Sequence, residues 1–172
     1  ESVTLPKDLS EISDNMFTGC ASLQRISIPN GVKSIGDNAF SGCASLRIMV
    51  LPAGLDEISH NAFMDCSSLF FVRMPKSISY IGENAFYGCS ALKSISIPAG
   101  VEYVGDEAFG YCSKLASATI PDNVTFGYRV FNNCKKLGTI TAGKNLKDLS
   151  VEDIEDTEYY NNEENWADGV LY

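Results

Sequence analysis

The strongest constraint on this chain is a step of 23 residues between its prolines, which lie at Pro6, Pro29, Pro52, Pro75, Pro98 and Pro121. The chain contains no other proline. Six cysteines keep the same step, except that the last interval is one residue shorter: Cys20, Cys43, Cys66, Cys89, Cys112 and Cys134. Self-similarity at a period of about 20 to 50 residues is typical of solenoids, whose stacked units bury one continuous core. The sequence therefore predicts a repeat array.

Each repeat follows the pattern Leu-x-x-Ile-x-Ile-Pro-x-x-Val-x-x-Ile-Gly-x-x-Ala-Phe-x-Gly-Cys. The Ile-x-Ile step has the alternation of a short strand that points two side chains inward. Proline fixes φ and brings no N–H to a sheet, so it should end each strand. We therefore expect one parallel strand in each repeat.

The second half of each repeat is expected to return the chain to the next strand. Val-x-x-Ile sends two more apolar side chains inward, and Gly-Asp/Glu-Asn-Ala-Phe predicts a single helical turn. The residues at the start of that turn are expected to cap it through their side-chain oxygens. They are Asp14, Asp37, Glu83 and Asp106, with His60 in the same position of the third repeat.

Two side chains of every repeat should form ladders through the core. The phenylalanines are expected to stack as a spine: Phe17, Phe40, Phe63, Phe86, Phe109 and Phe131. Six cysteines also allow three disulfides. However, one cysteine per repeat at one angular position is typical of a packing position, where a buried thiol behaves as a small hydrophobe. We therefore expect free, buried thiols.

Charge is distributed unevenly along the chain, which has a net charge of −9. Residues 1–147 hold thirteen acids and thirteen bases, whereas residues 148–172 hold nine acids and no base. A neutral array without a basic stripe lacks the electrostatic footprint of a nucleic-acid or anionic-lipid binder. No apolar run reaches the roughly 20 residues that a membrane-spanning helix needs, and the chain shows no signal-peptide pattern.

We expect two segments in the chain. Residues 1–149 form an array of about six to seven repeats, of which the first is partial and the last is degenerate, with Leu146 and Leu149 at inward positions. Residues 150–172 are acidic and non-repetitive. They are expected to form a short acidic helix or a loop, as a solvated linker or turn, before a predicted strand at Val170–Tyr172. Both ends stop within a unit, so we expect a fragment of a longer protein whose exposed sheet edges tend to associate end to end.

The motif IGENAFYGCSALKSISIP resembles the BspA-like leucine-rich repeats, of the 23-residue Treponema pallidum type. The resemblance covers residues 1 to about 149 and rests on proline, Ala-Phe, cysteine and the Leu-x-x-Ile-x-Ile strand recurring in register. It implies a right-handed, curved leucine-rich repeat solenoid with short helical turns opposite the strands. It also implies an extracellular or cell-surface bacterial protein, because family members are often described as adhesins.

The outward side chains of the strands are the candidate binding surface. Most of them are serine or threonine, but Ile48, Val50 and Phe71 form a local exception. Arginines and a second phenylalanine surround them: Arg25, Arg47, Phe70 and Arg73. Exposed apolar residues rimmed by arginine are typical of a protein-binding hot spot. The alternative is that these residues only improve cross-strand pairing.

Binding is therefore the leading functional hypothesis, with a protein or a glycan as the partner. A structural spacer without a ligand of its own is the alternative. Catalysis is disfavoured because Cys66, near His60 in sequence, occupies an inward position where a thiol is inert. The sequence has no Gly-rich phosphate loop, nucleophile elbow or paired metal-ligand spacing, so we expect no enzyme activity, cofactor or metal.

Overall fold

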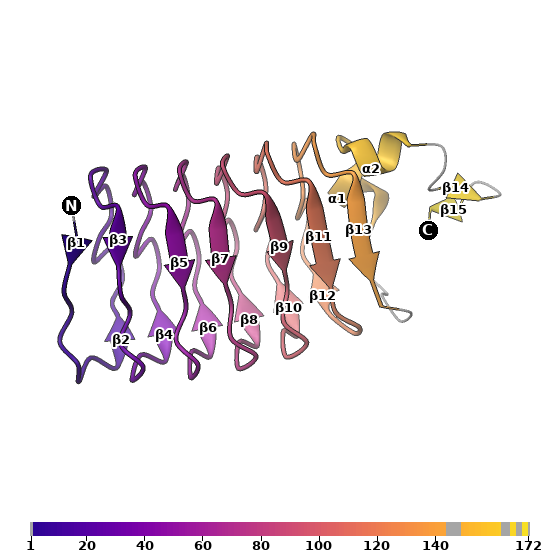
Figure 1. Ribbon diagram of the computed structural model, residues 1–172. Coiled ribbons are helices and arrows are strands. Elements are labelled where there is room, and N and C mark those ends of the chain that lie inside the picture. Colours follow the sequence, from indigo (N-terminus) through magenta and orange to yellow (C-terminus); the bar gives the residue numbers. More distant parts are fainter. Residues whose placement is uncertain (1, 144–148, 163–165, 168–169, 172) are drawn as a thin grey trace.

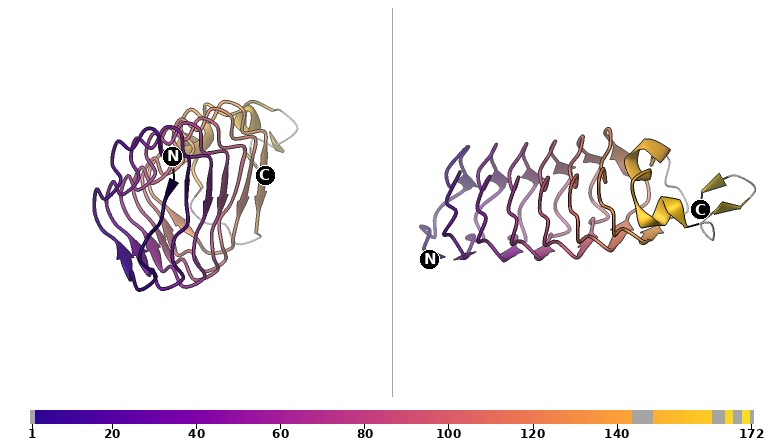
Figure 2. Two further views of the ribbon diagram at one scale, coloured as in Figure 1. Left: turned by 60° about the vertical axis from the view of Figure 1, so that its left-hand side comes forward. Right: turned by 90° about the horizontal axis from the view of Figure 1, so that it is seen from above.

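The computed structural model describes residues 2–143, 149–162, 166–167 and 170–171 of the chain. Residues 2–143 form a parallel β-solenoid whose coils stack along one axis (Figure 1). Figure 2 shows the same stack from above, with the helices at its C-terminal end. The predicted solenoid fold is thus confirmed.

The predicted strand of each repeat forms the front sheet. Its strands are β1 (Ser2–Val3), β3 (Arg25–Ile26), β5 (Ile48–Val50), β7 (Phe71–Arg73), β9 (Ser94–Ser96), β11 (Ser117–Ile120) and β13 (Thr139–Ala142). Every pair in this sheet is parallel and shifted by one repeat, so that Ile48 lies opposite Phe71. One column of inward side chains therefore comes from one position of the repeat.

A second sheet, which sequence reasoning missed, lies on the other side of the coils. Its six parallel strands are β2 (Glu11–Ile12), β4 (Ser34–Ile35), β6 (Glu57–Ile58), β8 (Tyr80–Ile81), β10 (Tyr103–Val104) and β12 (Thr125–Phe126). Each strand has two residues, of which only the second is buried. A strand this short has too little alternation to be recognised in a sequence.

The single helical turn expected at Gly-Asp/Glu-Asn-Ala-Phe does not form in the coils that the structure describes. Its asparagine is left-handed instead, with φ of 58° at Asn15, 56° at Asn38 and 52° at Asn84. A left-handed residue interrupts a right-handed helix, and asparagine tolerates this conformation better than most residues do. The backbone bonds to the next coil, as when the Phe40 N–H donates to the Ala62 carbonyl oxygen at 2.8 Å.

The six spine phenylalanines stack through the centre of the solenoid. Neighbouring ring centroids are 5.1 to 5.6 Å apart, and the ring planes lie within 14° of parallel. Phe40, Phe63, Phe86, Phe109 and Phe131 are fully buried. Each ring stacks on the equivalent ring of the neighbouring coil, so the spine connects the coils along the axis of the solenoid.

The acidic segment after the last coil is not a solvated linker. Its helices α1 (Val151–Ile154) and α2 (Glu158–Asn161) lie at the C-terminal end of the stack (Figure 1). Ile154 and Tyr159 are buried, and the Tyr159 N–H donates to the Leu137 carbonyl oxygen at 2.6 Å. The buried Asp153 carboxylate accepts from the Val130 N–H at 3.0 Å and from the Ser150 N–H at 2.8 Å. The segment therefore covers one end of the core.

Beyond α2, the strands β14 (Trp166–Ala167) and β15 (Val170–Leu171) pair antiparallel. The strand expected at Val170–Tyr172 thus falls on β15, while Tyr172 lies outside the described residues. Leu149 is half-buried against the core, as expected. Leu146, the other inward residue expected in the degenerate repeat, also lies outside the described residues.

Candidate functional site

The register of the front sheet brings the predicted site residues together. Ile48 lies opposite Phe71, and Val50 lies opposite Arg73, on the pair of strands β5 and β7. The same columns carry only hydroxyl residues further along: Ser94 lies opposite Ser117, which lies opposite Thr139. The apolar exception is therefore confined to neighbouring coils of one face.

Four large apolar side chains of this region are exposed to solvent. The exposed fraction is 45% for Ile48, 43% for Val50, 42% for Phe70 and 45% for Phe71. Full burial of such a side chain stabilises a fold by about 1.5–3 kcal/mol relative to full exposure, so each of these side chains, which are a little under half exposed, forgoes somewhat less than half of that gain. A cluster of this kind marks a surface that another molecule can cover.

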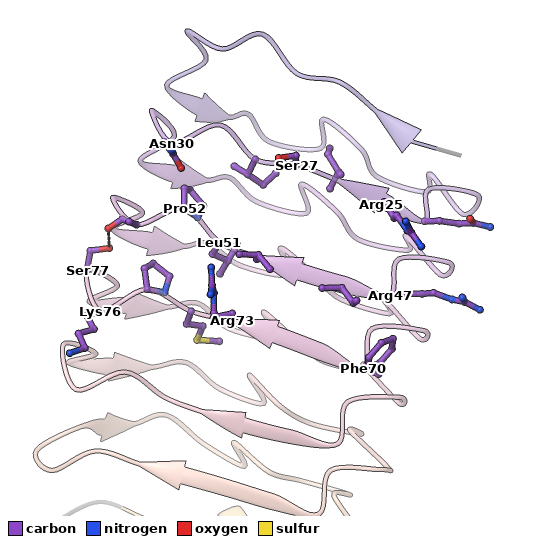
Figure 3. Close-up of a pocket in the computed structure, with 18 residues that line it drawn as sticks. Arg25, Ser27, Asn30, Arg47, Leu51, Pro52, Phe70, Arg73, Lys76 and Ser77 are labelled. Atoms are coloured by element: carbon purple, nitrogen blue, oxygen red, sulfur yellow. Dashed lines mark hydrogen bonds between the residues drawn. The ribbon is translucent and has the colours of Figure 1, made fainter.

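These residues adjoin a surface groove of about 1110 Å³. Six of the seven predicted site residues line it: Arg25, Arg47, Ile48, Val50, Phe70 and Arg73. Phe71 lies outside the groove lining but beside it, because it is the cross-strand neighbour of Ile48. Figure 3 shows Arg25, Arg47 and Phe70 near the start of the front strands, with Pro52, Lys76 and Ser77 at the other end.

The groove is cationic. Its lining includes Arg25, Arg47, Arg73 and Lys76 and contains no aspartate or glutamate. Among the described residues, none of these four side chains makes an ion pair or a side-chain hydrogen bond. The groove therefore has the sign of charge opposite to the chain, whose net charge is −9. The N–H donors of these four cationic side chains remain available to a ligand.

Sequence reasoning missed the half of the groove that lies beyond the strands. The alternation along a strand identifies its outward columns and the residues beside them, but it does not extend to the turns after the prolines. The missed lining residues include Asn30, Leu51, Pro52, Ala53, Met74, Pro75, Lys76 and Ser77. A usable signal was present, because Lys76 follows Pro75 in the same repeat that carries Arg73.

The front sheet is divided at the groove. Its strands hydrogen-bond as three separate groups: β1 with β3, β5 with β7, and β9 with β11 and β13. The groove lining crosses the division between β3 and β5, since it takes Ser27 and Ile28 from one side and Val50 and Leu51 from the other. Strands β5 and β7 register three residue pairs, as β9 and β11 do, so the apolar residues accompany no more extensive pairing.

The acidic residues expected to cap helical turns have a different role, because those turns are absent. The Asp14 Oδ1 atom accepts from the Asp37 N–H at 2.8 Å, and the Asp37 Oδ1 atom accepts from the His60 N–H at 3.0 Å. His60 continues this ladder, since its Nδ1 atom accepts from the Glu83 N–H at 3.2 Å. Each side chain thus links one coil to the next.

In the described part of the chain, no group of three or more His, Cys, Asp or Glu is placed to hold a metal ion.

The cysteines form a second ladder of sulfur hydrogen bonds. All six are free thiols, and Cys43, Cys66, Cys89, Cys112 and Cys134 are buried. Each buried thiol donates to a phenylalanine carbonyl oxygen of the preceding coil, as Cys66 does to Phe40 at 3.2 Å. Burial raises the pKa of the Cys66 thiol well above its ordinary value, so it stays protonated and unreactive. Cys20, which was expected to be buried, is exposed because no coil precedes it among the described residues.

Known proteins share this architecture. A family model of the BspA type leucine-rich repeat region matches residues 1–76 and 34–162, with six copies of the repeat. A leucine-rich repeat protein of T. pallidum is 36% identical, and the match covers 81% of this chain and 68% of that protein, with a TM-score of 0.78. A leucine-rich repeat protein from Bacteroides ovatus is 25% identical over 91% of this chain and 52% of that protein, with a TM-score of 0.59.

No curated protein is significantly similar to the chain. This chain spans about half the length of the Bacteroides protein and about two thirds of the T. pallidum protein. Neither helix that the structure describes is long and apolar enough to cross a bilayer.

Proposed function

Because the chain belongs to the BspA-type leucine-rich repeat family, we propose that it is a macromolecule-binding module of a secreted or cell-surface bacterial protein. In this proposal the module serves adhesion and contacts its partner through the front sheet. The partner covers the exposed Ile48, Val50, Phe70 and Phe71 side chains and the adjoining groove. The proposal assigns the protein a binding role and no catalytic one.

The observation that supports this proposal best is the contrast between strands of the same sheet. Strands β9, β11 and β13 carry serine and threonine on the outside and pair continuously. Strands β5 and β7 carry the apolar residues, yet they pair only with each other. The hydroxyl-bearing strands β9 and β11 register three residue pairs, as β5 and β7 do, so pairing of this extent does not require outward apolar residues. This contrast favours the proposal that the exposed apolar residues of β5 and β7 bind a partner over the alternative that they only improve strand pairing.

The test is binding of the purified protein to immobilised extracellular-matrix proteins and glycans. The variant Ile48→Ser/Phe71→Ser gives β5 and β7 the outward residue that β9 already carries as Ser94, so the coils should still form. The matched control is Ser94→Ala/Ser117→Ala, which changes the same column of outward residues away from the groove. Circular dichroism and thermal melting establish that each variant is folded.

We expect saturable binding that the Ile48→Ser/Phe71→Ser variant loses and the control keeps. Equal binding by both variants would refute a site on the front sheet. Absence of binding by the unaltered protein would favour the alternative role of a structural spacer, which needs no contact surface.

A further inference from the structure

The four cations of the groove are spread along its length and not clustered. Arg25 and Arg47 lie near the start of the front strands, and Lys76 lies at the opposite end (Figure 3). Arg73 lies between them, beside Leu51 (Figure 3). A ligand that fills the groove therefore meets positive charge at both of its ends.

The lining between the cations is mainly apolar, although Ser27 also belongs to it. Ile48 and Val50 project from β5 and are nearly half exposed, whereas Ile28 and Leu51 are buried beneath the surface. Met74 adds further apolar atoms to the lining, and Phe70 adds an aromatic ring at the end that carries Arg47 (Figure 3). Such a surface gains free energy when apolar groups of a ligand displace water from it. The centre of the ligand should therefore be apolar.

The length of the groove sets the size of the ligand. The lining includes both Arg47 and Ala53, seven consecutive positions that contain the whole of strand β5. At about 3.3 Å per residue, an extended segment of this length spans roughly 20 Å. An extended peptide of about seven residues matches that span when it lies parallel to the strands.

We infer that the groove takes an extended peptide segment of a partner protein whose short apolar centre is flanked on both sides by carboxylates. This inference rests on the proposed function, because it names the partner chemistry of the same surface. Arginine forks bind carboxylates in a bidentate geometry, and a groove without acids does not repel them. A sulfated polysaccharide also carries negative charge, but it has no apolar centre to cover Ile48 and Val50.

The experiment uses labelled peptides and fluorescence anisotropy with the whole chain. The probe is Glu-Glu-Leu-Phe-Leu-Glu-Glu. One control peptide, Lys-Lys-Leu-Phe-Leu-Lys-Lys, reverses the charge, and a second, Glu-Glu-Ser-Gly-Ser-Glu-Glu, removes the apolar centre. A heparin-derived hexasaccharide represents the sulfated polysaccharides. We expect saturable binding of the first peptide alone, weakening as sodium chloride rises from about 50 mM to about 500 mM.

Two charge-neutralising variants test the two ends of the groove. Arg25→Gln/Arg47→Gln and Arg73→Gln/Lys76→Gln should each raise the Kd for the acidic peptide by about tenfold. The matched control Lys93→Gln/Lys114→Gln removes two exposed cations that do not line the groove, and it should leave the Kd unchanged within about twofold.

Tighter binding of the hexasaccharide, or equal binding of the lysine peptide, would overturn the inference. So would binding of the acidic peptide that none of the groove variants weakens. If the acidic peptide does not bind while matrix binding still depends on Ile48 and Phe71, the inference fails and the proposed function stands. If matrix binding is independent of those two residues as well, both fail.

Discussion

The aromatic spine predicts that one substitution in its middle destabilises the solenoid strongly. The Phe86 ring is fully buried and stacks on Phe63 at 5.2 Å and on Phe109 at 5.4 Å. Phe86→Ala removes the apolar surface of the ring and leaves a cavity that the two neighbouring coils cannot fill without shifting. A buried phenylalanine truncated to alanine costs about 3–5 kcal/mol, so we expect a loss in this range from the free energy of unfolding.

Equilibrium unfolding in urea, followed by far-ultraviolet circular dichroism, measures this loss. The matched control is Phe17→Ala, because Phe17 stacks on a single ring, Phe40, and is 9% exposed. The control should lose clearly less stability than Phe86→Ala. A loss below about 1 kcal/mol for Phe86→Ala, or an equal loss for both variants, would refute the idea that the spine supports the stack from coil to coil.

Three further predictions concern the positions that link the coils. Burial raises the pKa of Cys43 from 9.0 to about 11, so the folded state disfavours its thiolate; stability should be complete below pH 9 and should fall as the pH rises through 11. Thermal melts at pH 7 and about 10.5 should show a drop in Tm that is smaller in Cys43→Ala. Asp37→Ala removes the acceptor of the His60 N–H and should cost about 0.5–1.5 kcal/mol in urea melts, whereas Asp37→Asn keeps an oxygen there and should cost less. Asn84→Ala, at φ 52°, should cost about 1 kcal/mol in the same melts, and Asn84→Gly less; equal losses would contradict the left-handed assignment.

The repeat period predicts the parts of this fold that every coil shares. A residue demanded once per repeat, such as the phenylalanine at positions 40, 63 and 86, must occupy one angular position in the coil, and these rings are indeed stacked. The inward and outward columns of the front strands follow from the same argument, because side chains alternate along a strand. The exposed cluster around Ile48 was therefore visible as a departure from the hydroxyl columns.

Features that depend on contacts between coils were harder to predict. Taken alone, the Asp-Asn pair predicts a capped helical turn. In the structure, however, Asn38 adopts φ 56°, and the Asp37 side chain accepts a hydrogen bond from the next coil. Local propensity favours the helix, whereas backbone bonds to neighbouring coils decide the outcome. The packing of α1 and α2 was missed for a related reason, since the high acid content of residues 148–172 concealed the buried Ile154 and Tyr159.

The positions of the charged residues in the repeats could not be predicted from their number. Residues 1–147 hold equal numbers of acids and bases, which suggests an array indifferent to charge. The structure instead places several of these charges on different sides of the coils according to their sign. Arg25, Arg47, Arg73 and Lys76 line the groove on the front sheet, whereas Glu11, Asp14 and Glu57 line a hollow of about 400 Å³ beside the second sheet. An acidic partner is attracted to one side of the coils and repelled from the other, so the same charges that sum to zero can orient it before contact.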